Sequence, residues 1–271
     1  MADSTIWKDA PLVALDLEGT GAQDRDDEAI LEIAVVPFTD GHPSLANAYS
    51  TLVNPERPVP RKPWISPGLT DEALKDAAGL DKVEPELATR LNGQIIIGHN
   101  IGTDWRLLHR RCPDIQPADM IDTLRLARYL HPGQKRNALT ALLDRYHLTG
   151  QVSALAPGSQ PHRALWDTAG AAVLLTTLIN DLPTASTLTY SELRHIAGLP
   201  LTPSGPIRAS HSRPRCWTSD GLLPHNGGGP FCRWREPGPA RVPQGQEIVI
   251  LVWRLSMTRP AAGSSSGVPA G

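Results

Sequence analysis

The chain has 271 residues, enough for one sizeable core or two small domains, and its 40% hydrophobic and 20% charged residues are typical of a globular protein. No apolar run approaches eighteen residues and no basic segment with an apolar run opens the chain, so we expect a soluble protein without a membrane span. Three cysteines without a framework spacing favour a reduced, cytoplasmic location. Residues 1–200 carry 18 lysines and arginines against 25 acids, a balance of −7, which argues against a broadly basic surface that binds nucleic acid regardless of sequence.

The first half of the chain is predicted to hold short strands followed by helices. Three apolar stretches with short links indicate an antiparallel meander, and a later, fully apolar stretch is typical of a parallel strand buried on both faces. Thr70 suits a helix N-cap, Pro85 the start of a second helix, and Asn92-Gly93 its end. The expected strands cover residues 12–17, 30–36, 46–53 and 94–98.

The second half is predicted to be mostly helical, because apolar residues recur every three or four positions. Pro132-Gly133 separates two helices, Leu182-Pro183 ends the longest one, and Thr189 with Glu192 resembles a capping box for a last short helix. The expected helices follow Asp104 and cover residues 122–130, 137–146 and 164–179, with a short one after Thr189. We therefore expect one α/β domain over residues 11–182 and a short helical extension over 183–200.

Residues 201–271 differ in composition from the rest, with 10 prolines and 10 glycines, which predicts a disordered tail. Within it, residues 247–253 read as a strand without an obvious partner. A zinc set is conceivable, but its spacing matches no known finger pattern, so surface side chains are favoured. The four residues of this conceivable zinc set are His211, Cys216, His225 and Cys232.

Acidic residues and one histidine form the most informative pattern. Asp16 and Glu18 lie two apart on a predicted strand, so both side chains leave the same face, where like charges raise each other's pKa or require cations. Asp167 interrupts an apolar helix and must be solvated, paired or metal-bound. His162 follows a proline- and glycine-containing loop, and its ordinary pKa suits the removal of a proton from water. Taken singly, each residue could equally be a strand end, a helix cap or a surface side chain.

Three segments carry these residues in a characteristic order, namely residues 15–21, 98–104 and 162–167. They resemble the three motifs of the DEDDh, or DnaQ-like, 3′-to-5′ exonuclease family, which includes the proofreading subunit of bacterial DNA polymerase III. The resemblance covers about residues 11–182 and implies an RNase H-like mixed sheet, an antiparallel meander plus parallel strands, flanked by helices. It also implies that His162 is the general base and that two Mg²⁺ or Mn²⁺ ions bind the acids. The implied ligands are Asp16, Glu18, Asp104 and Asp167.

The resemblance further implies contacts to the end of a nucleic acid strand. Small residues after the first acids would let the backbone approach the terminal nucleotide, and Thr20 could bond its 3′ end, although a tight turn also selects glycine. The candidate substrate contacts are Gly19, Thr20, Gly21, His99 and Asn100. Asn100 could instead only fix its loop by bonding to the backbone. Thr103 stands where the family commonly has an aromatic residue, and Gly19 replaces a commoner threonine or alanine.

Two other functions fit parts of the pattern. Residues 16–20 also resemble the Asp-x-Asp-Gly-Thr start of haloacid-dehalogenase-like phosphatases, whose first aspartate is a phosphorylated nucleophile. Glu18 is one methylene too long for the second aspartate, and Asp104 and His162 would then be unused. A non-catalytic scaffold bound to a polymerase or to nucleic acid would not need all five residues.

We therefore predict a metal-dependent 3′-to-5′ exonuclease that releases nucleoside 5′-monophosphates from single-stranded ends, of DNA more than of RNA. The expected partners are a single-stranded DNA or RNA 3′ end and a DNA polymerase or repair complex, with no membrane. A basic group is a candidate for the edge of a substrate groove or for an ordinary solvated helix face. Its members are Arg125, Arg128, Lys135 and Arg136.

Overall fold

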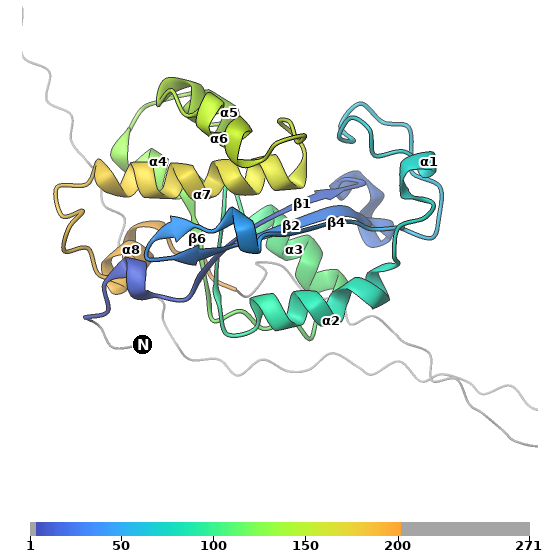
Figure 1. Ribbon diagram of the computed structural model, residues 1–271, viewed down its shortest axis with the longest axis horizontal. Coiled ribbons are helices and arrows are strands. Elements are labelled where there is room, and N and C mark those ends of the chain that lie inside the picture. The colour runs from blue at the N-terminus through green and yellow to red at the C-terminus, as the bar shows by residue number, and fades with distance from the viewer. Residues whose placement is uncertain (1–3, 202–271) are drawn as a thin grey trace, which may run out of the picture. The chain divides into compact units, whose positions relative to one another are not determined.

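The computed structural model describes residues 4–201. Its centre is a mixed sheet of six strands with the order β3-β2-β1-β5-β6, in which β4 also pairs with β2 (Figure 1). β2 and β4 are antiparallel to their neighbours, whereas β5 and β6 run parallel to β1. The strands are β1 Leu12–Gly19, β2 Ile30–Thr39, β3 His42–Pro43, β4 Tyr49–Leu52, β5 Ile95–Gly98 and β6 Asp119–Asp122.

The antiparallel meander and the buried parallel strand are confirmed, with β5 fully buried between β1 and β6. The sequence did not reveal β6, since this strand has only four residues and an aspartate at each end. Asp122, which we expected inside a helix, ends β6 and also caps the next helix by accepting a hydrogen bond from the Leu124 N–H at 2.9 Å. The short strand β3 was also not predicted.

Eight α-helices lie within the described residues. They are α1 Asp71–Leu74, α2 Leu80–Leu91, α3 Gly102–Arg111, α4 Thr123–Leu130, α5 Leu139–Arg145, α6 Thr149–Leu155, α7 Ala164–Asn180 and α8 Tyr190–Ala197. Short 3-10 turns cover Trp7–Asp9, Ala22–Asp27 and Leu45–Asn47. The Thr70 cap and the capping box at Thr189 are confirmed, whereas α6 was not predicted. No described helix is both long enough and apolar enough to span a bilayer.

The predicted start of the second helix at Pro85 is wrong, because α2 begins five residues earlier, at Leu80. Pro85 cannot donate a backbone hydrogen bond inside a helix. The apolar side of α2 packs into the core under the sheet, with Val83, Leu87 and Leu91 buried. Burial of these side chains compensates for the bond that Pro85 cannot make. The predicted end at Asn92-Gly93 is confirmed.

Helices cover both faces of the sheet (Figure 1). Alternate residues of β1, among them Leu15 and Leu17, enter the core shared with α2 and α3, while Ala14 faces α7 on the opposite side. The long helix α7 is apolar on nearly all sides, because it lies between the sheet and the layer of α4, α5 and α6. The strand period of two therefore sends Asp16 and Glu18 toward α7.

The domain boundaries stay predictions. The extension over 183–200 contains α8, whose Leu193 and Ala197 join the same core as α7. The predictions for the tail, including its disorder, the strand over 247–253 and the zinc set, lie outside the described residues.

Candidate active site

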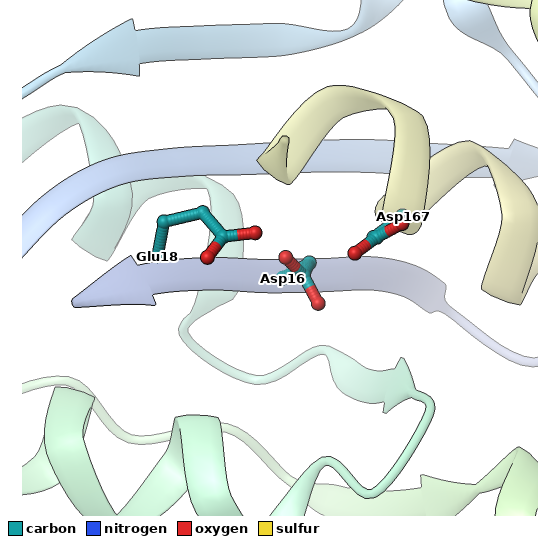
Figure 2. A group of neighbouring side chains, drawn as sticks. All are labelled: Asp16, Glu18 and Asp167. Carbon is teal, nitrogen blue, oxygen red and sulfur yellow. The ribbon is translucent and has the colours of Figure 1, made fainter. Parts of the chain in front are cut away.

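Three carboxylates meet where β1 passes under the start of α7. Figure 2 shows Asp16 and Glu18 rising from β1 toward Asp167, which comes from the first turn of α7. Each of the three offers an oxygen that lies within 4.8 Å of the oxygens of the other two. Such a set matches the oxygen ligands that hard divalent cations prefer.

The electrostatics of this cluster require a compensating charge. Burial, and then repulsion from neighbouring acids, raises the pKa of Asp16 well above its usual value. Burial raises the pKa of Glu18 to about 8, against the opposing effect of a hydrogen bond from Ser66, and that of Asp167 to about 6. Asp16 Oδ2 is buried and has no hydrogen-bond partner within the described part of the chain. An orphaned buried carboxylate oxygen among other acids fits a cation ligand.

The fourth predicted acid, Asp104, lies beside this cluster but outside the three mutually close oxygens. It belongs to the first turn of α3, and its Oδ1 accepts a hydrogen bond from the Leu17 N–H at 3.1 Å. The pairing of β5 with β1 stops at Ala14, so this edge of β1 is open to a side chain. Among charged neighbours, Asp104 contributes most to the raised pKa of Asp16, and burial raises its own pKa to about 7. Asp104 therefore contributes negative charge to the site while also bracing β1.

His162 lies at the mouth of the cluster and is exposed. Its backbone has a φ of 65°, and its N–H donates to Asp167 Oδ1 at 3.4 Å. This bond and the nearby imidazole lower the pKa of Asp167, opposing the stronger effect of burial. The main chain of His162 thus contacts the acids, and the ring is left at the surface.

The glycines after the first acids have structural reasons of their own. Gly21 has a φ of +92°, which side-chain-bearing residues rarely adopt, and a Cβ on Gly19 would lie 2.9 Å from Leu107. Thr20 is buried, and its hydroxyl accepts a hydrogen bond from the Ala29 N–H at 2.9 Å. The contact of the Thr20 hydroxyl with a 3′ end stays a prediction.

His99 and Asn100 also have partners within the protein. The two ring nitrogens of His99 lie 2.9 Å from Thr123 Oγ1 and 2.8 Å from the Asn137 carbonyl oxygen. Asn100 has a φ of 63°, and its side chain donates to Thr103 Oγ1. These bonds fix the loop between β5 and α3, so a role in substrate contact stays a prediction for both residues.

An ion pair that the sequence did not reveal holds the start of α7. Glu32 on β2 is buried and accepts two hydrogen bonds from the Arg163 guanidinium, at 2.7 and 2.8 Å, and a third from the Ala164 N–H at 3.2 Å. Glu32 therefore caps α7 from the sheet. The available signals were an acid within the apolar strand 30–36 and an arginine directly after His162.

Two hollows lie near the acids. One of about 530 Å³ is lined by residues of the segment 59–72, among them Ser66, whose hydroxyl donates to Glu18. A smaller one of about 140 Å³ is lined by Asp104 together with Gly19, Gly21, Thr103 and Arg106.

Carboxylates that meet in this way, on a mixed sheet under the start of a helix, are the ligand type with which many phosphoryl-transfer enzymes bind divalent cations. Residues 13–175 match the family model RNase_T, which is described as an exonuclease. The match covers more than half of the chain, which therefore belongs to this exonuclease family.

Individual relatives agree with the family. The chain is 33% identical over 172 residues to a DNA polymerase III of PolC type from Thermotoga maritima, which covers 62% of this chain and 12% of the polymerase. It is 24% identical over 189 residues to the 3′-5′ exonuclease DinG of Bacillus subtilis, covering 68% of this chain and 19% of DinG. Among solved structures, Exonuclease X in complex with 5′ overhanging duplex DNA matches with a TM-score of 0.50 and 30% identity. That match covers 67% of this chain and 99% of Exonuclease X.

The chain thus spans a small part of the curated relatives and nearly all of Exonuclease X. The resemblance to DEDDh, DnaQ-like exonucleases and the RNase H-like mixed sheet are confirmed. The chain is a nuclease by family, which favours that function over the phosphatase considered from residues 16–20.

Proposed function

We propose that the chain is a 3′-to-5′ exonuclease that hydrolyses the terminal phosphodiester of single-stranded nucleic acid and releases nucleoside 5′-monophosphates. The observation that carries the proposal is the group of Asp16, Glu18 and Asp167, whose oxygens lie within 4.8 Å of each other, with the Asp16 Oδ2 buried and unpartnered. The repulsion among these carboxylates is relieved when divalent cations bind.

The four acids would share two Mg²⁺ or Mn²⁺ ions. Asp16, Glu18 and Asp167 offer oxygens from two elements, and Asp104 lies close enough to raise the pKa of Asp16. When bound, two such ions stabilise the attacking and the leaving oxygen of a phosphoryl displacement.

His162 is proposed to accept the proton of the attacking water. Its main chain is anchored to Asp167 while its side chain is exposed, so the ring can approach a phosphate held at the acids. A neutral imidazole has a ring nitrogen that can accept a proton from water, as a general base must.

The substrate and direction of cleavage are proposed with support from the relatives. DinG is named a 3′-5′ exonuclease, and both the PolC-type polymerase and the Exonuclease X complex concern DNA. We therefore favour DNA over RNA and a DNA polymerase or repair complex as partner. A single-stranded end is favoured because a paired end must fray before its last phosphate reaches a pocket of acids.

The test uses single-stranded DNA and RNA of equal sequence, labelled at the 5′ end, with Mg²⁺, Mn²⁺ or chelator. We expect a ladder that shortens from the 3′ end, faster for DNA and absent in chelator. Asp16→Asn should lower the rate about a thousandfold or more, since the charge stabilisation supplied by metal ions amounts to several kcal/mol. Asp114→Asn, at an exposed acid away from the cluster, is the matched control. Equal rates for Asp16→Asn and the parent chain would refute the assignment.

A further inference from the structure

An exposed tryptophan stands beside the acidic cluster. Trp64 retains 47% of its surface exposed, and only one other large hydrophobic side chain in the described part of the chain, Tyr129, is comparably open. Trp64 lies in the loop between β4 and α1, where its indole Nε1 donates to the Thr20 carbonyl oxygen at 3.1 Å. The ring is therefore held in one place although much of it faces solvent.

The anchoring connects this ring to the candidate active site twice. A Cβ on Gly21 would lie 2.7 Å from Trp64 Nε1 and 2.9 Å from Cδ1, so this edge of the indole packs against the turn that follows Glu18. Two residues after Trp64, the Ser66 hydroxyl donates to Glu18 itself. The loop consequently fixes both the indole and one candidate metal ligand.

The same turn has two sides with different properties. The Thr20 side chain is buried on the inner side, and its hydroxyl accepts a hydrogen bond from the Ala29 N–H. Trp64 packs against the turn at Thr20 and Gly21, and the Lys62 ammonium lies over its ring, 5.8 Å from the centroid. Arg61 and Lys62 are both exposed. An open aromatic ring with neighbouring cations is the usual combination for binding single-stranded nucleic acid, because bases stack on the ring and phosphates meet the cations.

We propose that Trp64 is the stacking surface for the base of the 3′-terminal nucleotide. The inference rests on the proposed function and adds the residue that holds the end of the strand beside the acids. Stacking on an indole uses the π-face that every base has, so this contact binds all four bases.

Binding rather than cleavage gives the sharpest test. All proteins carry Asp16→Asn, so that the oligonucleotide survives, and fluorescence anisotropy of a single-stranded DNA labelled at its 5′ end reports the dissociation constant. Adding Trp64→Ala should weaken binding about tenfold, in line with the loss of one base–aromatic stack. Trp64→Phe, which keeps a ring but loses the N–H, should stay within a few-fold of the parent, and Tyr129→Ala should match it.

The position of the base is tested with abasic oligonucleotides. When the 3′-terminal nucleotide lacks its base, proteins with Trp64 and with Trp64→Ala should bind equally. When only an internal nucleotide five positions away is abasic, the tenfold difference should persist. Equal binding of both proteins to the intact strand, an undiminished difference on the terminally abasic strand, or a Trp64→Phe variant as weak as Trp64→Ala would overturn the proposal. Failure of the proposed function is distinguished by the separate cleavage assay of the unsubstituted chain.

Discussion

Two groups of acids, one buried and one half-buried, lie close together in this fold and differ in what surrounds them. Glu28 accepts hydrogen bonds from the Arg106 guanidinium at 2.6 and 3.0 Å, and Glu32 forms the same kind of bidentate pair with Arg163. Both glutamates are almost fully buried. Each charge is therefore compensated by a cation that the chain itself supplies.

The second group has no such compensation. Among the side chains that the structure describes, residues 4–23 and 26–201, no lysine or arginine forms an ion pair with Asp16, Glu18 or Asp167. Glu18 lies directly opposite Glu32 in the pairing of β1 with β2, yet the ion pair of Arg163 is with Glu32. Burying an acid without a partner costs free energy, so the fold tolerates these three for a reason other than its own stability. Glu28 and Glu32 therefore stabilise the fold, whereas Asp16, Glu18 and Asp167 are suited to bind a cationic ligand.

Replacing His162 should have a large effect, and on activity alone. His162→Asn keeps a residue that tolerates the positive φ and retains the backbone bond to Asp167, but removes the base. We expect cleavage to slow by about 10²- to 10⁴-fold, the usual contribution of a general base. The melting temperature and the affinity for Mn²⁺ should stay close to those of the parent. A variant that cleaves at the parental rate would remove His162 from the reaction.

Replacing the neighbouring residue Arg163 should instead lower the stability of the fold. Arg163→Met keeps the length of the side chain but leaves Glu32 buried without its cation, which we expect to cost about 3 kcal/mol of unfolding free energy. Urea denaturation followed by circular dichroism measures this. Adding Glu32→Gln should restore part of the loss, since the unpaired charge is then gone. If the single variant is as stable as the parent, the ion pair is not what secures the start of α7.

The unpaired acids should also give the metal-free protein a characteristic pH dependence. The pKa of Glu18 is raised to about 8 and that of Asp104 to about 7, so the folded state retains protons that the unfolded state has released. Stability then falls as the pH rises through these values. The pKa of His99 is lowered, so its own titration lies below this range. Between pH 6.5 and 8 in chelator, we expect the melting temperature to drop, and the gain from added Mg²⁺ to be larger at pH 8.

Glu18→Gln tests whether Glu18 contributes to this pH dependence. The substitution removes an acid whose pKa is raised to about 8 and keeps a hydrogen-bond acceptor for Ser66. Its metal-free melting temperature should depend less on pH over the same interval. An unchanged pH dependence would mean that Glu18 does not retain a proton in the folded state.

Local patterns predicted much of this fold and of its acids. The strands β1, β2 and β5 and the helix α7 carry strong apolar patterns, and the position of Glu18 two residues after Asp16 follows from the strand period. The strand β6 was missed because four residues bounded by acids carry no such pattern. The early start of α2 was missed because burial against the sheet outweighed the proline rule.

Contacts between distant segments could not be read from the sequence. Glu32 and Arg163 are 131 residues apart, and their pairing depends on where β2 passes under α7. The bonds from Ser66 to Glu18 and from Trp64 to Thr20 depend on how the loop before α1 folds back over β1. The inward orientation of Thr20 is likewise set by Ala29 across the turn.

Direct titration of divalent cations, without nucleic acid, tests the central claim most closely. Isothermal calorimetry with Mn²⁺ at pH 7.5 should show binding to the parent chain, and Asp16→Asn should abolish it or weaken it strongly. Arg163→Lys, which retains a cation beside Glu32, should bind as the parent does. A parent chain that binds no Mn²⁺, or an Asp16→Asn variant that binds it equally well, would contradict the claim that these clustered acids bind divalent metal ions.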